Sequence, residues 1–285
     1  MASNLTQRVV FAAIAIPVAL GIVYWGGWPL VLVVSAAAAL GAKELYGFAR
    51  RQGVEPLQRT GMLSAAAVPI LAYLNVTGAS RLAEWGWFLG GLWMVLLLTI
   101  ALWRRRPTDH PLAVTSATVL GVLYPAGLAS FLIPIRHATY GTASWAGAWL
   151  VFFPLVITWV CDTAAMFAGK AIEGPKLWPA ISPGKTWAGS IAGMIAALAT
   201  VPALNALVLS RLGVALPLGQ GLLFALVLGV VGQVGDLAES LYKREVGVKD
   251  SSSLIPGHGG VLDRFDSLYF VLPVSAAMYR LFGVL

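Results

Sequence analysis

The chain alternates between long apolar runs and short polar stretches along most of its length. A membrane-spanning helix needs about 20 mostly apolar residues, because the hydrocarbon core of a bilayer is about 30 Å thick. Runs that reach or approach this length cover residues 8–25, 29–48, 61–76, 85–103, 112–133, 147–169, 187–209, 220–242 and 264–284. The pattern therefore predicts an all-α, polytopic integral membrane protein with about nine transmembrane helices.

Composition agrees with this prediction. The 285 residues are 59% hydrophobic and only 11% charged, with a mean hydropathy of +0.81. A soluble domain carries about 25% charged residues, so this composition excludes a water-soluble globule. One membrane domain suffices for the length, with motif-free helices in residues 1–110 and the candidate chemistry in residues 111–285. Cys161 is the single cysteine, so no internal disulfide can form.

The basic residues are distributed unevenly between the two sides that nine spans would create. The side of the N-terminus collects fifteen of the 19 Lys and Arg residues: Arg8, Lys43, Arg50, Arg51, Arg59, Arg104, Arg105, Arg106, Lys170, Lys176, Lys185, Lys243, Arg244, Lys249 and Arg264. The other side has Arg81, Arg136, Arg211 and Arg280. The positive-inside rule then predicts a cytoplasmic N-terminus, an outer C-terminus and polar loops in the cytosol. For Arg50, Arg51 and 104–106 we favour a role in topology alone.

One polar stretch, residues 240–266, is not explained by packing. It holds two Lys, two Arg, one Glu, three Asp, one His and three clustered glycines between two apolar runs. Charge placed beside hydrocarbon is costly and indicates a functional site. This mixture suits a divalent metal, a polyphosphate and a second phosphate.

Four carboxylates are expected at a similar depth. Asp162 and Asp236 lie about 15 residues into spans that run in the same direction, and Asp263 and Asp266 open the ninth span. Carboxylates that converge repel one another unless a hard cation such as Mg²⁺ joins them. We favour metal binding for Asp236 and Asp263. For Glu239 and Asp266 an ion pair with a nearby Lys or Arg is an equal alternative.

Two further segments suit phosphate groups. Gly257, Gly259 and Gly260 precede the ninth helix, where backbone N–H groups and the helix dipole favour anions, and His258 could donate to a phosphate or cap the turn. Residues 182–186 read Ser-Pro-Gly-Lys-Thr, but Pro179 stands where a P-loop needs glycine and no strand precedes it. Ser182, Lys185 and Thr186 could still hold phosphate oxygens. The alternative is a helix start capped at Ser182.

Residues 240–266 resemble the signature of the phosphatidate cytidylyltransferase, or CDP-diacylglycerol synthase, family. The matching positions are Ser240, Lys243, Arg244, Lys249, Asp250, Ser252, Ile255, Pro256, His258, Gly259, Gly260, Asp263, Arg264, Phe265 and Asp266. Upstream, Asp162, Lys176, Leu177, Pro179, residues 182–186 and Gly189 also resemble family positions. Tyr242 departs from the Phe or aliphatic residue usual there. The resemblance covers about residues 150–285.

The resemblance implies an enzyme integral to the cytoplasmic (inner) membrane, with its active site facing the cytosol. It implies that CTP and phosphatidate give CDP-diacylglycerol and pyrophosphate in phospholipid biosynthesis. It also implies a Mg²⁺ requirement, a second monovalent cation such as K⁺, and a homodimer.

The residues then receive expected roles. Asp236 and Asp263 would hold the metal, and the glycine loop would hold the triphosphate. The phosphates of CTP or lipid would be held by Lys243, Arg244, Lys249 and Arg264. The residues that orient these donors would be Asp250, His258 and Asp266.

Three other functions compete with this interpretation. A CDP-alcohol phosphotransferase would need a pattern of spaced Asp residues that this chain lacks. A CTP-dependent lipid-alcohol kinase would transfer phosphate instead of releasing pyrophosphate. An ion transporter would place its carboxylates near the bilayer centre, whereas the charges here gather at one face.

Overall fold

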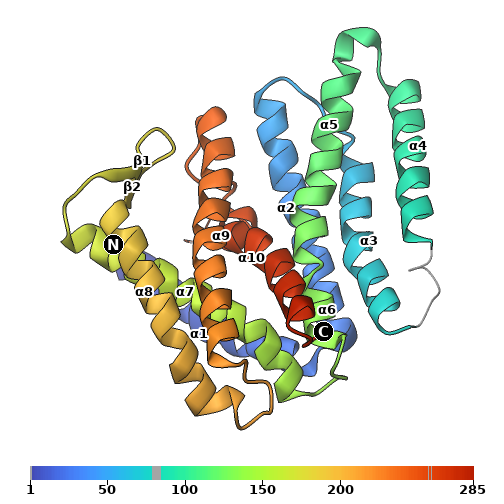
Figure 1. The fold of residues 1–285 in the computed structure, drawn as a ribbon. Coiled ribbons are helices and arrows are strands. Elements are labelled where there is room, and N and C mark those ends of the chain that lie inside the picture. The colour runs from blue at the N-terminus through green and yellow to red at the C-terminus, as the bar shows by residue number, and fades with distance from the viewer. Residues whose placement is uncertain (1, 79–84, 256, 258) are drawn as a thin grey trace.

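The protein, seen in a computed structural model that describes residues 2–78, 85–255, 257 and 259–285, is built almost entirely of helices (Figure 1). The first half forms α1 (Ala2–Trp25), α2 (Gly27–Arg51), α3 (Gln58–Val76), α4 (Gly86–Arg104), α5 (Pro111–Val122) and α6 (Leu132–His137). The second half forms α7 (Trp145–Ala171), β1 (Lys176–Trp178), β2 (Ser182–Thr186), α8 (Trp187–Leu204), α9 (Leu218–Glu245) and α10 (Leu262–Leu281). Short π-helical segments continue α5 over Leu123–Gly127 and α8 over Asn205–Leu209.

The predicted all-α membrane class is confirmed, but the predicted count of nine spans is not. Within the described residues, six helical segments are long and apolar enough to cross a membrane: α2, α4, Pro111–His137, α7, Trp187–Leu209 and α9. Helix α10 is not among them, because Asp263, Arg264, Asp266 and Arg280 interrupt its apolar character. Within α1, Ala13–Trp25 forms a shorter apolar helical segment.

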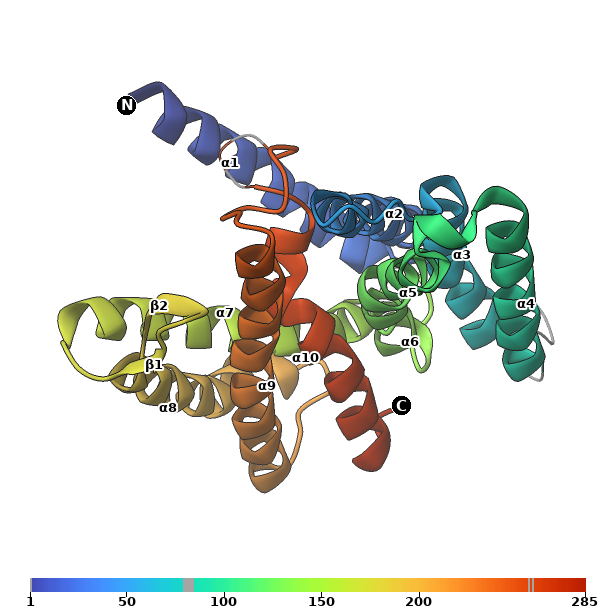
Figure 2. The ribbon, with the colours of Figure 1, turned by 90° about the horizontal axis from the view of Figure 1, so that it is seen from above.

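The helices pack in two groups that meet along α10. In one group α2 packs against α3 and α5, and in the other α7, α8, α9 and α10 pack in succession. Figure 2 shows α9 and α10 between the α7–α8 pair on one side and α2 to α6 on the other. Helix α10 also contacts α2, so the two halves of the chain share one interior.

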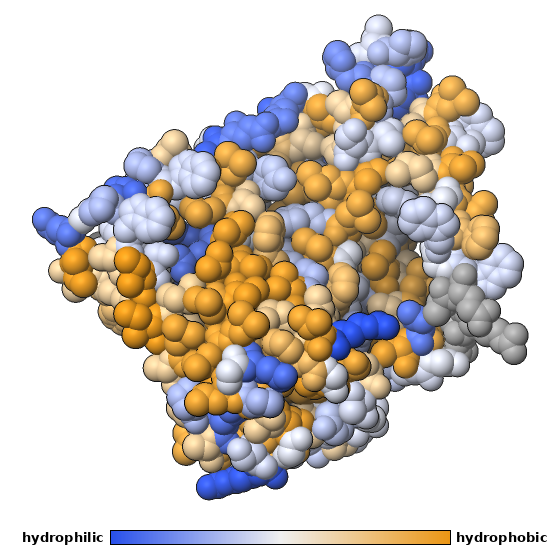
Figure 3. Space-filling view, viewed as in Figure 1, coloured by the Kyte–Doolittle hydropathy of each residue, from blue (hydrophilic) through white to orange (hydrophobic). Residues whose placement is uncertain are grey.

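Much of the surface is apolar, as a bilayer requires. On α4 only Leu97 and Ala101 are buried, while Trp87 is 91% exposed and Leu102 is 76% exposed. Figure 3 shows apolar side chains over a broad area of one face, with hydrophilic residues gathered mainly along its upper edge. The hairpin and the carboxyl ends of α2 and α9 lie at that same end of the molecule (Figure 1). Exposed apolar side chains on this scale match lipid rather than water as solvent.

The polar segment between α7 and α8 is not the simple loop that the sequence suggested. Strands β1 and β2 pair antiparallel, with Lys176 opposite Thr186 and Trp178 opposite Ser182. The alternative of a helix start capped at Ser182 is wrong, because α8 begins at Trp187 and its cap is Thr186. The Thr186 Oγ1 accepts a 3.0 Å hydrogen bond from the Gly189 N–H. The Gly-Lys-Thr string therefore lies in a strand and not in a phosphate-binding loop.

Candidate active site

A polar cavity of about 390 Å³ lies between α7, β2, α8, α9 and α10. Carboxylates from three helices line it: Asp162 from α7, Asp236 from α9 and Asp266 from α10. Lys170 and Lys185 line it as well. The expected convergence of acids from separate spans is thus present for these three, and we call this set of five charged residues the pocket region.

The hairpin brings a cation to these acids. Lys185 Nζ lies 2.8 Å from Asp236 Oδ2, and the two side chains are 25% and 32% exposed. The other Asp236 oxygen, Oδ1, accepts a 3.2 Å hydrogen bond from the Ser240 hydroxyl one turn further along α9. Ser182, Gly184 and Thr186 line the same cavity. Asp236 is therefore part of an ion pair, and its partner comes from the second polar segment.

Asp263 lies apart from this cavity lining, in a buried set of hydrogen bonds. Its Oδ1 accepts from Lys243 Nζ at 2.8 Å. Its Oδ2 accepts from the Ser251 N–H, the Ser251 hydroxyl and the Gly260 N–H, each at 2.8 Å. Lys243 also lies 3.2 Å from Glu239, four residues earlier on α9. Asp263 and Lys243 therefore have each other as partners, and the Gly260 N–H donates to a protein carboxylate.

Sequence reasoning missed Lys170 of the pocket region and, in a second place, Glu44. Glu44 comes from α2, in the half of the chain without motifs, and its carboxylate accepts hydrogen bonds from the segment before α10. A single acid near the end of an apolar span was the available signal, because an ionisable group in a membrane helix indicates function. We call Glu44, Lys243, Ser251, Ser252 and Asp263 the loop clamp.

The remaining predicted residues are more dispersed. Arg244 donates to the carbonyl oxygens of Ile181 at 3.2 Å and Val248 at 3.0 Å, so it ties the hairpin to the end of α9. Lys249, Asp250 and Arg264 are exposed. Gly257 and Gly259 have φ values of 73° and 82°, a conformation that favours glycine. His258 lies outside the described residues.

The donor chemistry of the pocket region suits a hard cation. No group of three or more His, Cys, Asp or Glu side chains forms a complete metal site within the part of the chain that the structure describes. Mg²⁺ needs no such cage, because it binds one or two carboxylates and keeps water and substrate phosphate oxygens as its other ligands. Asp162, Asp236 and Asp266 supply carboxylates of this kind.

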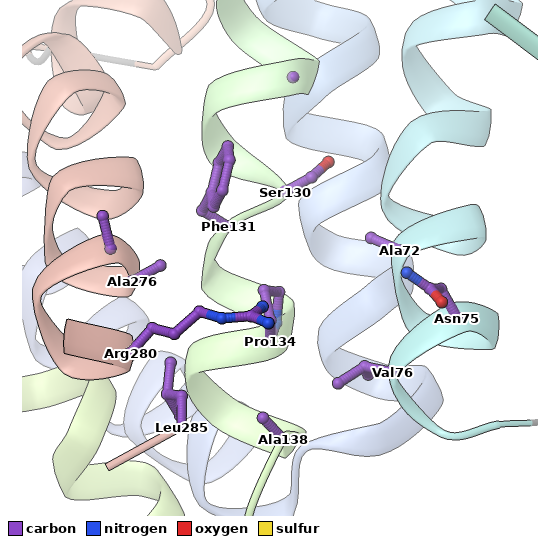
Figure 4. A pocket seen from close by; sticks show the side chains of 12 residues that line it. Ala72, Asn75, Val76, Ser130, Phe131, Pro134, Ala138, Ala276, Arg280 and Leu285 are labelled. Atoms are coloured by element: carbon purple, nitrogen blue, oxygen red, sulfur yellow. The ribbon is translucent and has the colours of Figure 1, made fainter. Parts of the chain in front are cut away.

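A larger cavity, of about 570 Å³, lies between α3, α6 and α10 near the C-terminus. Its lining is mainly apolar and includes Asn75, Ser130, Phe131 and Arg280, whose side chain extends across it (Figure 4). It contains no carboxylate side chain among its lining residues and none of the predicted site residues. The smaller, polar cavity is therefore the candidate active site.

Comparison with known proteins covers nearly the whole chain. A family model described as "Cytidylyltransferase family" matches residues 6–282. The chain is 37% identical over 229 residues to the phosphatidate cytidylyltransferase of Brucella suis, covering 75% of this chain and 78% of that protein. It is 35% identical over 297 aligned positions to the one of Pseudomonas aeruginosa, covering 96% of both. The Bacillus subtilis protein of that name is 31% identical over 284 positions, covering 98% of this chain and 99% of that protein.

Proposed function

The chain belongs to the cytidylyltransferase family, and we propose that it transfers the cytidylyl group of CTP to phosphatidate, giving CDP-diacylglycerol and pyrophosphate. One observation supports this most strongly: a polar cavity with three carboxylates and two lysines opens among helices whose outer surfaces are apolar. Such a site suits a reaction between a charged nucleotide and a lipid. The three bacterial relatives named phosphatidate cytidylyltransferase support the same substrates.

The proposed reaction is a displacement at phosphorus. A phosphate oxygen of phosphatidate attacks the α-phosphorus of CTP, the bond from the α-phosphorus to its bridging oxygen breaks, and pyrophosphate leaves. The attacking phosphate is already anionic near neutral pH, so the reaction needs no general base. Catalysis then consists of holding two polyanions together and offsetting their charge.

The pocket region offers groups for both tasks. Lys185 and Lys170 would donate to phosphate oxygens, and Lys185 would exchange its contact with Asp236 for one with the substrate. Asp236, beside Asp162 and Asp266, would hold Mg²⁺, which when bound offsets charge on the phosphate oxygens. Asp263, the predicted second ligand, would first have to release its bonds from Lys243 and Ser251. The exposed Lys249 and Arg264 would contact phosphates at the cytosolic edge.

The lipid would enter from the side. On α8, the helix that follows the hairpin, Ile191 is 58% exposed and Ile195 is 62% exposed, so lipid would cover this surface. Trp178 and Trp187 are also exposed at the level of the hairpin, and aromatic side chains of this kind sit at membrane–water interfaces. The acyl chains of phosphatidate would remain in the bilayer while its phosphate reaches the cavity.

The charge asymmetry counted over the nine predicted runs supports a cytosolic active site, with the N-terminus inside and the C-terminus outside. The resemblance to the family supports the inner (cytoplasmic) membrane as its location. Leu254 is exposed in the loop before α10 and has no assigned role, so a cysteine there tests the orientation. Native Cys161 is buried and should not interfere. In intact cells, Leu254→Cys should resist membrane-impermeant thiol reagents and react after permeabilisation. Labelling of this cysteine from outside intact cells would show that the proposed orientation is wrong.

Two implied features stay predictions. Light scattering of the protein in detergent tests the homodimer, which requires twice the mass of one 30.1 kDa chain. Assays in buffers with K⁺ or with an organic cation test the monovalent ion, and K⁺ should raise the rate.

The decisive experiment for the function uses purified protein with phosphatidate, Mg²⁺ and each of the four nucleoside triphosphates. We expect CTP to support pyrophosphate release and formation of CDP-diacylglycerol. Equal rates with ATP and GTP would contradict the proposed substrate. Phosphate transfer to a lipid alcohol with release of CDP would instead identify a lipid kinase.

A further inference from the structure

Glu44 connects the half of the chain without motifs to the segment that bears the signature. Its side chain is 7% exposed on α2, and its hydrogen-bond partners lie more than 200 residues later in the chain. Burial of a carboxylate is costly unless hydrogen bonds or opposite charges satisfy it. Here hydrogen bonds satisfy it, and all four of those described come from one loop and the start of α10.

The four bonds are divided evenly between the two oxygens. Oε1 accepts from the Ser252 hydroxyl at 2.7 Å and from the Val261 N–H at 3.0 Å. Oε2 accepts from the Ser251 hydroxyl at 2.9 Å and from the Leu262 N–H at 2.8 Å. Each oxygen therefore accepts one hydrogen bond from a serine hydroxyl of the loop and one from a backbone N–H at the start of α10. A group with two equivalent acceptor oxygens is needed for this arrangement.

Close approach of the backbone makes the arrangement possible. A Cβ at position 260 would lie 2.5 Å from both Glu44 oxygens, so only glycine leaves room for the carboxylate. The same loop bonds to Asp263, because the Ser251 hydroxyl lies 2.8 Å from Asp263 Oδ2 and the Gly260 N–H donates to that oxygen. Two carboxylates, one from α2 and one from α10, thus hold the loop from both sides.

We propose that Glu44 is a positioning residue for the cytidylyl transfer, an inference that rests on the proposed function. It binds Ser251 and Ser252 of the loop and Val261 and Leu262 at the start of α10, and through them it sets the places of Asp263 and Lys243. Glu44 does not line the candidate active site, and its negative charge would repel phosphates. It therefore acts through the loop and not on the substrate.

Glu44→Gln tests this directly. Glutamine has one acceptor oxygen, and its amide nitrogen would face a hydroxyl and a backbone N–H, so either Val261 or Leu262 loses its acceptor. We expect kcat to fall about tenfold or more, as loss of a bond to a charged acceptor would produce, while KM for CTP stays within about threefold. Lys43→Gln, at the exposed neighbouring position, is the matched control and should leave both constants unchanged.

Hydrogen–deuterium exchange in detergent supplies a readout that does not depend on activity. In Glu44→Gln, a peptide covering residues 251–262 should exchange about fivefold faster or more, because a protecting bond is lost, while peptides from α7 keep the wild-type rate. Equal exchange in wild type and Glu44→Gln, or a kcat within twofold of wild type, would overturn the proposal. If the wild type shows no CTP-dependent activity, the proposed function is wrong. The comparison of hydrogen–deuterium exchange between wild type and Glu44→Gln still tests whether Glu44 stabilises the loop.

A milder variant covers the case in which Glu44→Gln does not fold. Ser252→Ala removes one donor and leaves both amides bonded to Glu44. We expect its kcat to fall about twofold to fivefold, with faster exchange in residues 251–262. Wild-type exchange and kcat in folded Ser252→Ala protein would then overturn the proposal.

Discussion

The pocket region and the loop clamp use the same kinds of charged residues in different surroundings. In the pocket region, Asp236 and Lys185 are about one-quarter to one-third exposed and line an open cavity. In the loop clamp, the Asp263 and Lys243 side chains are 5% and 10% exposed, and Asp263 accepts four hydrogen bonds. Partially solvated partners can be exchanged for a substrate at low cost, whereas buried partners cannot. We therefore infer that the first region carries out the chemistry and the second maintains its geometry.

The largest expected effect comes from Asp236→Asn. Asparagine has nearly the same shape, but it loses the charge that favours Mg²⁺ and the partner of Lys185. A loss of about 4 kcal/mol corresponds to roughly a thousandfold lower rate of pyrophosphate release. Gel filtration and the melting temperature in detergent should match the wild type. Near-wild-type activity at limiting Mg²⁺ would show that Asp236 is not a metal ligand.

Asp263→Asn should reduce activity by about a hundredfold and also destabilise the fold. The change removes the shorter of the two carboxylate contacts of buried Lys243 and leaves it only Glu239, and loss of a buried charged partner costs about 3 kcal/mol. The melting temperature in detergent should therefore fall by about 5 °C or more. An unchanged melting temperature combined with a weaker response to Mg²⁺ would instead support Asp263 as a direct metal ligand.

Lys185→Gln should affect activity without affecting stability. Loss of a charged hydrogen bond to a phosphate costs about 2 kcal/mol of transition-state stabilisation, which lowers kcat/KM roughly thirtyfold. The melting temperature should stay within about 2 °C, because an ion pair exposed to this extent contributes about 1 kcal/mol or less. Glu173→Gln, at an exposed position in the segment before the hairpin, serves as the control. A large stability loss in Lys185→Gln would contradict the distinction between the two regions.

The smallest effect is expected for Glu239→Gln. Glu239 is 1% exposed and lies 3.2 Å from Lys243, but it does not line the active-site cavity. Lys243 keeps its shorter contact with Asp263 in this variant. Activity should therefore fall by less than about tenfold, measured at saturating CTP and phosphatidate. A loss as large as that of Asp236→Asn would place Glu239 among the residues that contact the metal or substrate.

The sequence predicted most helices correctly, and it predicted that acids from separate spans converge. The nine predicted runs correspond closely to the observed helices, because segment length and hydropathy are local properties. The position of Asp162 and Asp236 at one level followed from helical rise alone, and both acids line one cavity. The hairpin was missed, because five residues containing Ser, Pro and Gly do not alternate as an amphipathic strand does.

Sequence alone determined the membrane class, the approximate helices and the polar segments on which the candidate site was predicted, since each depends on residues close together in the chain. Tertiary structure decided the partners: Lys185 for Asp236, Lys243 for Asp263, and Glu44 for the loop before α10. In a membrane protein most helix faces are apolar, so hydropathy does not show which faces meet. A contact between Glu44 and Leu262 joins residues 218 positions apart, and only packing brings them together.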